Sequence, residues 1–431
     1  MAKSSRRLNA DMLWLTSGHL LSAAAMLAMT KVWAVYLEPA EFGFMALVIG
    51  TASMLFAIVM GPLFQALLVG YIKHLQNGNG YDYRTVTSGL VRVRLAIIVV
   101  LILAVGGLFA WYWGLHWATP ILVIGLIIVD TIRTFEQRLF AAARRQREVA
   151  IITAGDVLFR VVFVLVFLNI YEANAYVAMA GNLAGAALFA ATIHMTFRLE
   201  SRSGTSLVSD KFQRTIADET SQLARPLLPS LFLANLTETG NRYIISAIVG
   251  LQTAGLFFAG YGFVRRPYGM LSNVGDMTMT PILKAAIEKG GGYEVERVRY
   301  RWLVFIVIFS FLGAVLFFIL RDPLVILLLS EKYIGVADML FGLAIAIALF
   351  SVANVFNWFS MTLGNSHAVL INNLVGSAVT TVLTIVLCFT IGVIGAVWAL
   401  IIGYGFQLLA SIITFGSVRK QHASNMLNSE I

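Results

Sequence analysis

The chain is 431 residues long, 59% hydrophobic and 12% charged, with a formal net charge of +9. Soluble domains contain about 25% charged residues, and no polar linkers divide this chain into soluble domains, so the composition excludes a soluble protein. The single cysteine, Cys388, lies in an apolar run, which also excludes a disulfide framework.

Apolar runs recur along the whole chain, and each is long enough to cross a hydrocarbon core of about 30 Å as a helix. Helices are expected because lipid satisfies no free backbone groups. The first run is too long for the apolar part of a signal peptide, so it is expected to be retained. The sequence predicts an all-α polytopic membrane protein with about twelve transmembrane helices, at residues 13–36, 43–70, 90–113, 119–143, 149–169, 174–196, 224–249, 255–281, 302–320, 334–358, 366–389 and 392–416.

The Lys and Arg residues between these helices are distributed unequally. When the N-terminus is placed in the cytoplasm, nearly all of them fall in cytoplasmic segments, and only Arg321 and Lys332 fall outside. Cytoplasmic loops of membrane proteins carry such an excess. The pattern predicts that both termini are cytoplasmic, and it accounts for much of the net positive charge without any nucleic-acid partner.

The longest polar interruption lies near the middle of the chain. It predicts an N-terminal six-helix lobe at 1–200, a cytoplasmic linker at 201–223 and a C-terminal six-helix lobe at 224–431. Gly43 in "YLEPAEFGFMALV" aligns with Gly255 in "IVGLQTAGLFFAG", which indicates a duplicated unit. We therefore expect two pseudo-symmetric bundles around a central cavity, because substrate sites of such proteins lie near the midplane between the repeats.

The predicted helix 255–281 carries charges far from either end. Arg265, Asp276 and Asn273 share one face of this helix, and Arg266 lies at its edge. An arginine at the bilayer centre costs at least about 2.5–3.5 kcal/mol when it faces lipid, so this face is expected to border a hydrated cavity. Pro267 removes a backbone donor and is either a hinge at the depth of the cavity or a simple bend in a packed helix.

Helix 224–249 has a similar polar face. Glu238 stands one turn before Arg242, which is the favourable order for an ion pair within a helix, and Asn235 lies beside them. The face is either a cavity wall with a protonatable carboxylate or a self-neutralising pair that permits insertion. Because buried carboxylates can titrate near neutral pH, Glu238 and Asp276 are the candidates for ion coupling.

The first half of the chain carries its own intramembrane charges. Asp130 and Arg133 lie in one predicted helix, and Asp156 and Arg160 lie in the next. For these four residues we favour charge pairs that fix helix packing over a role in ion coupling. Lys31 lies toward the outer end of the first helix, where it either reaches the interface or contributes to the cavity.

The sequence contains no pattern typical of an enzyme. It has no glycine-rich phosphate loop, no metal-ligand spacing and no nucleophile grouping. We therefore expect no catalytic residue, no metal and no cofactor.

Two stretches resemble a known family: "LEPAEFGFMAL" after the first helix and "LGNSHAVLINNLVGSAVTTVLTIVLCFTIGVIGAVWALIIGY" near the end. Together with twelve helices in two similar halves, they resemble the O-antigen and polysaccharide repeat-unit flippases of the multidrug/oligosaccharidyl-lipid/polysaccharide exporter superfamily. The resemblance implies a cationic cavity lined by helices one, two, seven and eight, which opens alternately to each side of the membrane. These helices carry Lys31, Glu238, Arg242, Arg265, Arg266 and Asp276, although helix two has no charge.

The resemblance implies a flippase for a polyprenyl-diphosphate-linked oligosaccharide in the bacterial inner membrane, with a polysaccharide polymerase and chain-length proteins as partners. One alternative is an ion-coupled drug exporter of the same superfamily, whose cavity should be acidic. Another is a membrane-embedded glycan polymerase or ligase, which should carry a large external loop. A scaffold without transport activity is the third.

Overall fold

The computed structural model describes residues 2–114, 116–196, 210–225, 228–288, 292–363 and 365–429. Within these ranges the chain forms α-helices and one short 3₁₀ helix, without strands. Eleven of the helices are long and apolar enough to cross a membrane. The all-α, polytopic architecture predicted from the sequence is confirmed.

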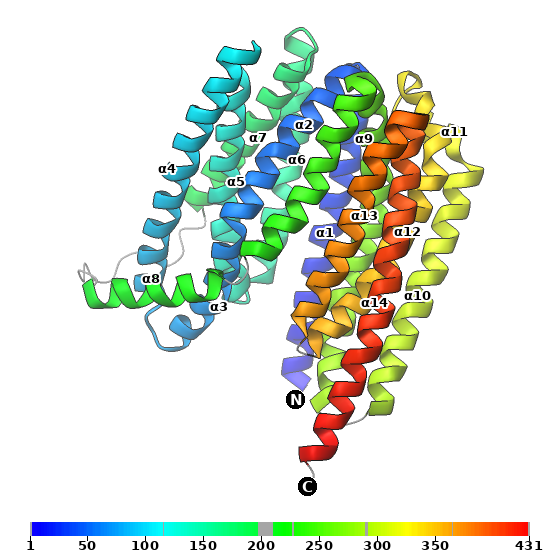
Figure 1. Cartoon of the computed structure of the whole chain (residues 1–431). Helices are drawn as coiled ribbons and strands as arrows, with labels where there is room; N and C mark the ends of the chain where they lie inside the picture. Colours follow the sequence, from blue (N-terminus) through cyan, green and yellow to red (C-terminus); the bar gives the residue numbers. More distant parts are fainter. Residues whose placement is uncertain are drawn as a thin grey trace. The chain divides into compact units, whose positions relative to one another are not determined.

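The chain divides into two compact units. Unit 1 contains Met1–Leu37 and Phe44–Thr239, and unit 2 contains Glu38–Gly43 and Gly240–Ile431. Figure 1 shows the helices in the colours of the sequence. Helices α2 and α9 each contribute residues to both units.

Unit 1 is built from long helices that pack closely. Gly18 of α1 lies against the backbone of Ala150 in α6, and Gly185 of α7 lies against the backbone of Arg160, also in α6. Small residues permit such close approach of helices in a membrane. The helices of this unit are α1 (Ala2–Tyr36), α2 (Pro39–Val59), α3 (Gly61–Gln76), α4 (Gly80–Trp113), α5 (Ala118–Ala142), α6 (Gln146–Ile170), α7 (Ala175–Thr196), α8 (Asp210–Ala224) and the start of α9 (Leu228–Glu288).

The single helix predicted at 43–70 is wrong, because the structure has two helices there. Helix α2 ends at Val59, and α3 begins at Gly61 with Pro62 in its first turn. Proline lacks the backbone donor that would continue the helix, and its ring clashes with the carbonyl one turn earlier. The break therefore follows from Pro62.

Unit 2 is also built from long helices. Its helices are the remainder of α9, α10 (Gly292–Ile319), α11 (Arg321–Leu328), the 3₁₀ helix η2 (Glu331–Val336), α12 (Ala337–Thr362), α13 (Ser366–Ile391) and α14 (Val393–Ser429). The segment between the predicted helices 302–320 and 334–358, from Arg321 to Tyr333, thus forms α11 and part of η2. Tyr333 is fully buried there.

Helix α9 consists of two arms that meet at Gly250. This glycine has φ 82° and ψ 161°, a conformation that only glycine adopts at little cost. The two arms correspond to the helices predicted at 224–249 and 255–281. The apolar stretch Thr239–Ser272 is one of the eleven candidate membrane spans only when the break at Gly250 is ignored. When its two arms are counted separately, the structure agrees with the prediction of about twelve membrane crossings.

The first turn of α2 packs directly on the second arm of α9. A methyl group added at Gly255 would overlap the carbonyl oxygen of Pro39 and lie 3.0 Å from the backbone nitrogen of Gly43. Gly43 and Gly255 are the two glycines that the repeat alignment pairs. Phe42 packs edge-on against Tyr333 beside this contact, at 5.8 Å between ring centroids.

We expect Gly255→Ala to destabilise the protein by about 1–3 kcal/mol, because the added methyl group has no room and overpacking costs this much. Thermal unfolding in detergent measures the effect. Gly262→Ala is the matched control, since it lies on the same helix and its added methyl group would meet no atom within 4 Å. Equal unfolding temperatures for the two variants would contradict the close packing.

The predicted linker 201–223 contains a helix, α8, which lies across the ends of α3 and α4 (Figure 1). Glu219 accepts hydrogen bonds from Lys73 Nζ at 3.0 Å and contacts His74 Nε2 at 3.4 Å. The buried ring of His74 stacks on Tyr83 at 4.7 Å and meets the edge of Phe212 at 5.8 Å. These contacts hold α8 on unit 1.

The hydrogen bond from Lys73 lowers the pKa of Glu219 below its usual value of 4.5, and the contact with His74 acts in the same direction. A lowered folded-state pKa contributes stability that is present above the unfolded value and lost as the pH falls through the folded value. We therefore expect α8 to detach more readily below about pH 4.5. The effect should be about 1 kcal/mol or less, because the pair is partly exposed.

Hydrogen exchange of the α8 amides, corrected for intrinsic rates, measures this detachment at pH 5.5 and 3.5. Glu219→Gln should remove the pH dependence, whereas Asp218→Asn on the exposed face of the same helix should retain it. Unchanged protection of the wild-type helix across this range would show that the ion pair does not hold α8.

Candidate functional site

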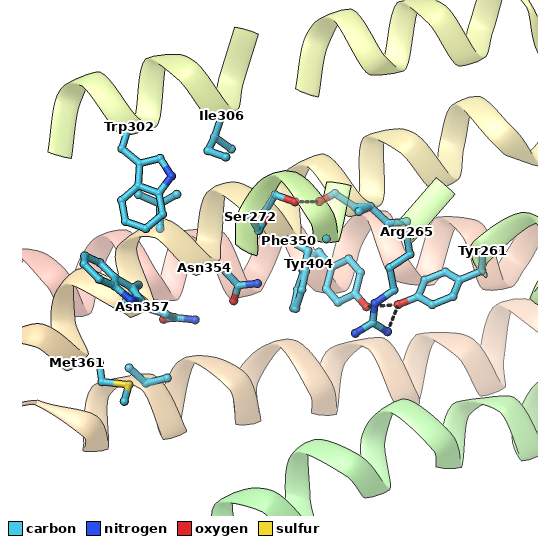
Figure 2. Close-up of a pocket in the computed structure, with 16 residues that line it drawn as sticks. Tyr261, Arg265, Ser272, Trp302, Ile306, Phe350, Asn354, Asn357, Met361 and Tyr404 are labelled. Atoms are coloured by element: carbon cyan, nitrogen blue, oxygen red, sulfur yellow. Dashed lines mark hydrogen bonds between the residues drawn. The ribbon is translucent and has the colours of Figure 1, made fainter. Parts of the chain in front are cut away.

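Unit 2 contains a half-open cavity of about 480 Å³. One face of the second arm of α9 forms a wall through Tyr261, Arg265, Gly269 and Ser272, which recur at helical spacing. Helix α12 forms the opposite wall, and α10, α13 and α14 complete the lining. Figure 2 shows the labelled side chains converging on this space.

Arg265 gives one end of the cavity a positive charge. Its Nη1 donates a hydrogen bond to Tyr261 Oη at 3.1 Å, and Tyr261 Oη lies 3.3 Å from Tyr404 Oη. The guanidinium carbon also lies 5.6 Å from the centre of the Tyr261 ring. The phenol groups orient the guanidinium, and none of the residues described as lining this cavity is acidic.

The other end of the cavity is aromatic and amide-rich. Trp302 and Trp358 meet edge to face at 4.9 Å between ring centroids, and Asn354 and Asn357 lie on α12 beside them. In Figure 2, Asn354 lies between the Arg265 end and the Asn357 end. The cavity therefore combines apolar ring surfaces with neutral hydrogen-bonding groups.

A buried polar network fixes Asn357. Its Oδ1 accepts hydrogen bonds from Asn372 Nδ2 at 2.8 Å and from Ser411 Oγ at 3.0 Å. Asn372 also exchanges hydrogen bonds with Thr414. This network ties α12 to α13 and α14, and satisfied buried networks of this kind rigidify their surroundings. The amide end of the cavity is thus held in one arrangement.

The other predicted cavity residues lie in different places. Arg242 is on the first arm of α9, with its guanidinium 5.9 Å from the ring of Phe258. Arg266 and Asn235 are half-buried on α9, and Lys31 is half-buried on α1. None of these four lines the cavity described here. Three more residues predicted for the site lie outside the part of the chain whose side chains the structure describes: Glu238, Asn273 and Asp276.

Pro267 lies within the second arm of α9. The backbone of this helix is described throughout, and Gly250 is its residue with non-helical torsions. The helix therefore continues through Pro267, whose role as a hinge stays a prediction.

In unit 1, the structure brings the four charges of α5 and α6 together. Arg160 donates to Asp130 Oδ1 at 2.7 Å and to both oxygens of Asp156 at 3.1 Å. Arg133 lies 3.6 Å from each of these carboxylates. Each charge thus has a partner of opposite sign, which is the arrangement that makes intramembrane charges tolerable. Among the residues described, no group of His, Cys, Asp or Glu side chains could hold a metal ion.

Sequence reasoning missed most of the cavity lining. Tyr261, Asn354, Trp358 and Tyr404 are uncharged, and the search for intramembrane charges passed over them. A signal was nevertheless present, because Ser351, Asn354 and Asn357 place polar groups in an otherwise apolar helix. Amides within a membrane helix require partners, and this requirement points to helix contacts or a cavity.

Residues 8–287 match the family described as "Polysaccharide biosynthesis protein". No curated protein sequence matches the chain. Among solved structures, the chain is similar to an inward-facing multidrug resistance MATE family transporter of the MOP superfamily, with a TM-score of 0.70, 13% identity, and 96% of this chain and 98% of that chain covered.

The lipid II flippase MurJ in an inward closed conformation is also similar, with a TM-score of 0.70, 12% identity and coverage of 96% and 91%. So is a MOP superfamily transporter from Pyrococcus furiosus, described as having a binding pocket of reverse polarity, with a TM-score of 0.66, 12% identity and coverage of 96% and 94%. Identities this low show a shared fold. The chain is therefore a multi-pass membrane protein with the fold of the MOP superfamily transporters, and it belongs to the polysaccharide biosynthesis protein family.

Proposed function

We propose that the protein is a flippase that moves a polyprenyl-diphosphate-linked oligosaccharide from the cytoplasmic to the outer leaflet of the bacterial inner membrane by alternating access. The observation that carries this proposal is the cavity of unit 2, which has Arg265 in its wall and no acidic group among its described lining residues. A guanidinium inside a membrane protein attracts a diphosphate, with which it can form strong, paired hydrogen bonds.

The comparisons support a flippase-type transporter. The family concerns polysaccharide biosynthesis, and one protein of the same fold is a lipid II flippase. In our proposal, Arg242, Arg266, Lys31, Asn235 and Asn273 add to a cationic substrate path. Glu238 and Asp276 are the proposed ion-coupling groups, and Pro267 is the proposed hinge.

The proposed topology places both termini in the cytoplasm, as the loop charges predict. A polysaccharide polymerase and chain-length proteins would receive the exported glycan. A drug-cation exporter is the less favoured alternative, since the described lining of the cavity offers a cationic substrate the guanidinium of Arg265 and no acidic side chain. A glycan polymerase or ligase is also less favoured, because α11 and η2 fill the longest segment that was expected outside.

Reconstitution into vesicles tests the proposal. A polyprenyl-diphosphate glycan with a fluorescent sugar is placed in both leaflets, and a membrane-impermeant quencher reports how much of it becomes accessible. We expect the protein to accelerate exchange between leaflets relative to protein-free vesicles. Exchange no faster than in protein-free vesicles, together with uptake of a cationic dye, would replace this proposal with the drug exporter.

A further inference from the structure

The two ends of the cavity in unit 2 differ in chemistry, and only one end suits a phosphate. Arg265, Tyr261 and Tyr404 meet at the charged end. The remaining lining is neutral and comes mainly from α12 and α10. A ligand that fills the whole cavity must therefore combine an anionic part with an uncharged part.

Asn354 offers a ligand a polar side chain at the neutral end. Its side chain is half-buried and lines the cavity, and it has no hydrogen-bond partner among the described residues. Asn357, by contrast, is occupied by the network with Asn372 and Ser411. A primary amide offers two donors and an acceptor, which matches a ligand whose hydroxyl groups both donate and accept.

Aromatic rings border the same space. Trp358 is half-buried and packs edge-on against Trp302, whose position is fixed because only 1% of its surface is exposed. Phe350 packs on Tyr404 at 4.9 Å and extends the aromatic lining toward the charged end. Such rings provide large, rigid apolar surfaces, and the C–H face of a sugar ring is an apolar surface that can lie on them.

Other ligand chemistries fit this end less well. An acyl or prenyl chain would leave the amide of Asn354 buried without a partner, which is costly. A second phosphate would find no cation there, and an ammonium group would find no carboxylate. A volume of about 480 Å³ lies within the range of cavities that enclose small organic ligands.

We infer that the neutral end of this cavity, formed by Asn354 and Trp358, is a subsite that binds an uncharged sugar ring of the lipid-linked glycan while Arg265 contacts its diphosphate. This inference rests on the proposed function and adds to it a position where glycan selectivity is set. The cavity then distinguishes substrates by their first sugars, while Arg265 binds the diphosphate that all of them share.

Equilibrium binding to the purified protein in detergent tests the subsite. The probes are farnesyl diphosphate, which has no sugar, and a panel of farnesyl-diphosphate monosaccharides that carry glucose, galactose, N-acetylglucosamine or N-acetylgalactosamine. For the wild type, we expect at least one sugar-bearing probe to bind more tightly than farnesyl diphosphate. In Asn354→Leu the ratio of the two affinities should fall by about 2- to 10-fold, the effect of one net hydrogen bond.

Two further variants make the result specific. Arg265→Gln should weaken the binding of both kinds of probe and leave their ratio unchanged. Trp358→Leu should lower the ratio, as Asn354→Leu does, and Asn169→Leu on the exposed end of α6 should change neither affinity. Circular dichroism and gel filtration confirm that each variant is folded.

The outcomes distinguish failure of the proposed function from failure of the sugar subsite. If the wild type binds neither diphosphate probe, the proposed function fails. If the wild type binds the sugar-bearing and sugar-free probes equally, or if Asn354→Leu and Trp358→Leu both keep the wild-type ratio, the subsite is overturned while the flippase proposal stands.

Discussion

Replacing Arg160 with methionine should lower the free energy of unfolding by about 3–5 kcal/mol, because removing one partner from buried ion pairs leaves an uncompensated charge. Arg160 is the closest cation to both Asp130 and Asp156. Without it the two carboxylates share only Arg133, at 3.6 Å from each. Denaturant unfolding in detergent, followed by circular dichroism, measures the loss.

Arg145→Met is the matched control in the same unit. Arg145 contacts Glu148 at 2.6 Å, as short a distance as any in the charge cluster, but its side chain is 42% exposed, against 12% for Arg160. An exposed pair contributes about 1 kcal/mol or less. The double variant Arg160→Met/Asp130→Asn should recover part of the lost stability. If Arg160→Met and Arg145→Met cost the same, the cluster does not stabilise unit 1.

Arg265→Gln should reduce the rate of glycan translocation by about 10- to 100-fold. Hydrogen bonds to charged groups contribute about 1.5–3 kcal/mol, and each 1.4 kcal/mol is a factor of ten. Glutamine keeps an uncharged hydrogen-bonding side chain at this position but removes the positive charge. The vesicle exchange assay described above measures the rate, and substituting Arg242 as well should abolish it.

Arg265→Lys and Arg321→Gln are the controls for this prediction. Lysine retains the charge but not the planar fork, so partial activity is expected. Arg321 lies near Asp322 and Asp338 on an exposed surface, and its replacement should leave the exchange rate unchanged. Wild-type exchange by Arg265→Gln would mean that this arginine does not bind the substrate.

Much of the architecture could be predicted from the sequence because membrane helices have strong local signals. Long apolar runs located nearly every helix, and the predicted spans 224–249 and 255–281 end and begin on either side of Gly250, where the structure has its break. The break at Pro62 was missed because the apolar run continues through it, although proline is the residue that interrupts such helices. The helix within the predicted linker was missed because its stability comes from contacts between Glu219 and α3, which lie far apart in the sequence.

The candidate site was harder to predict for two reasons. Most of its residues are uncharged, and their position depends on how the helices pack. Arg265 was identified because a charge inside an apolar segment requires an explanation. Asn354 and Trp358 have no such signal, since amides and aromatic rings are common in membrane helices. Which of them faces a cavity depends on how α9, α10 and α12 pack, and helix packing is a tertiary property that one-dimensional patterns do not contain.

The charge cluster of α5 and α6 also has a consequence for biosynthesis. The shortest contact of the cluster joins the two helices, from Arg160 to Asp130, and the connection between them is a short turn in which Arg144 adopts φ 57°. When α5 emerges from the ribosome, Asp130 has Arg133 beside it on the same helix but has not yet met Arg160, its closer partner, and burying these charges in lipid before the cluster is complete is costly. We therefore expect α5 to wait at the translocon until α6 arrives, so that the two helices enter the bilayer together as a hairpin.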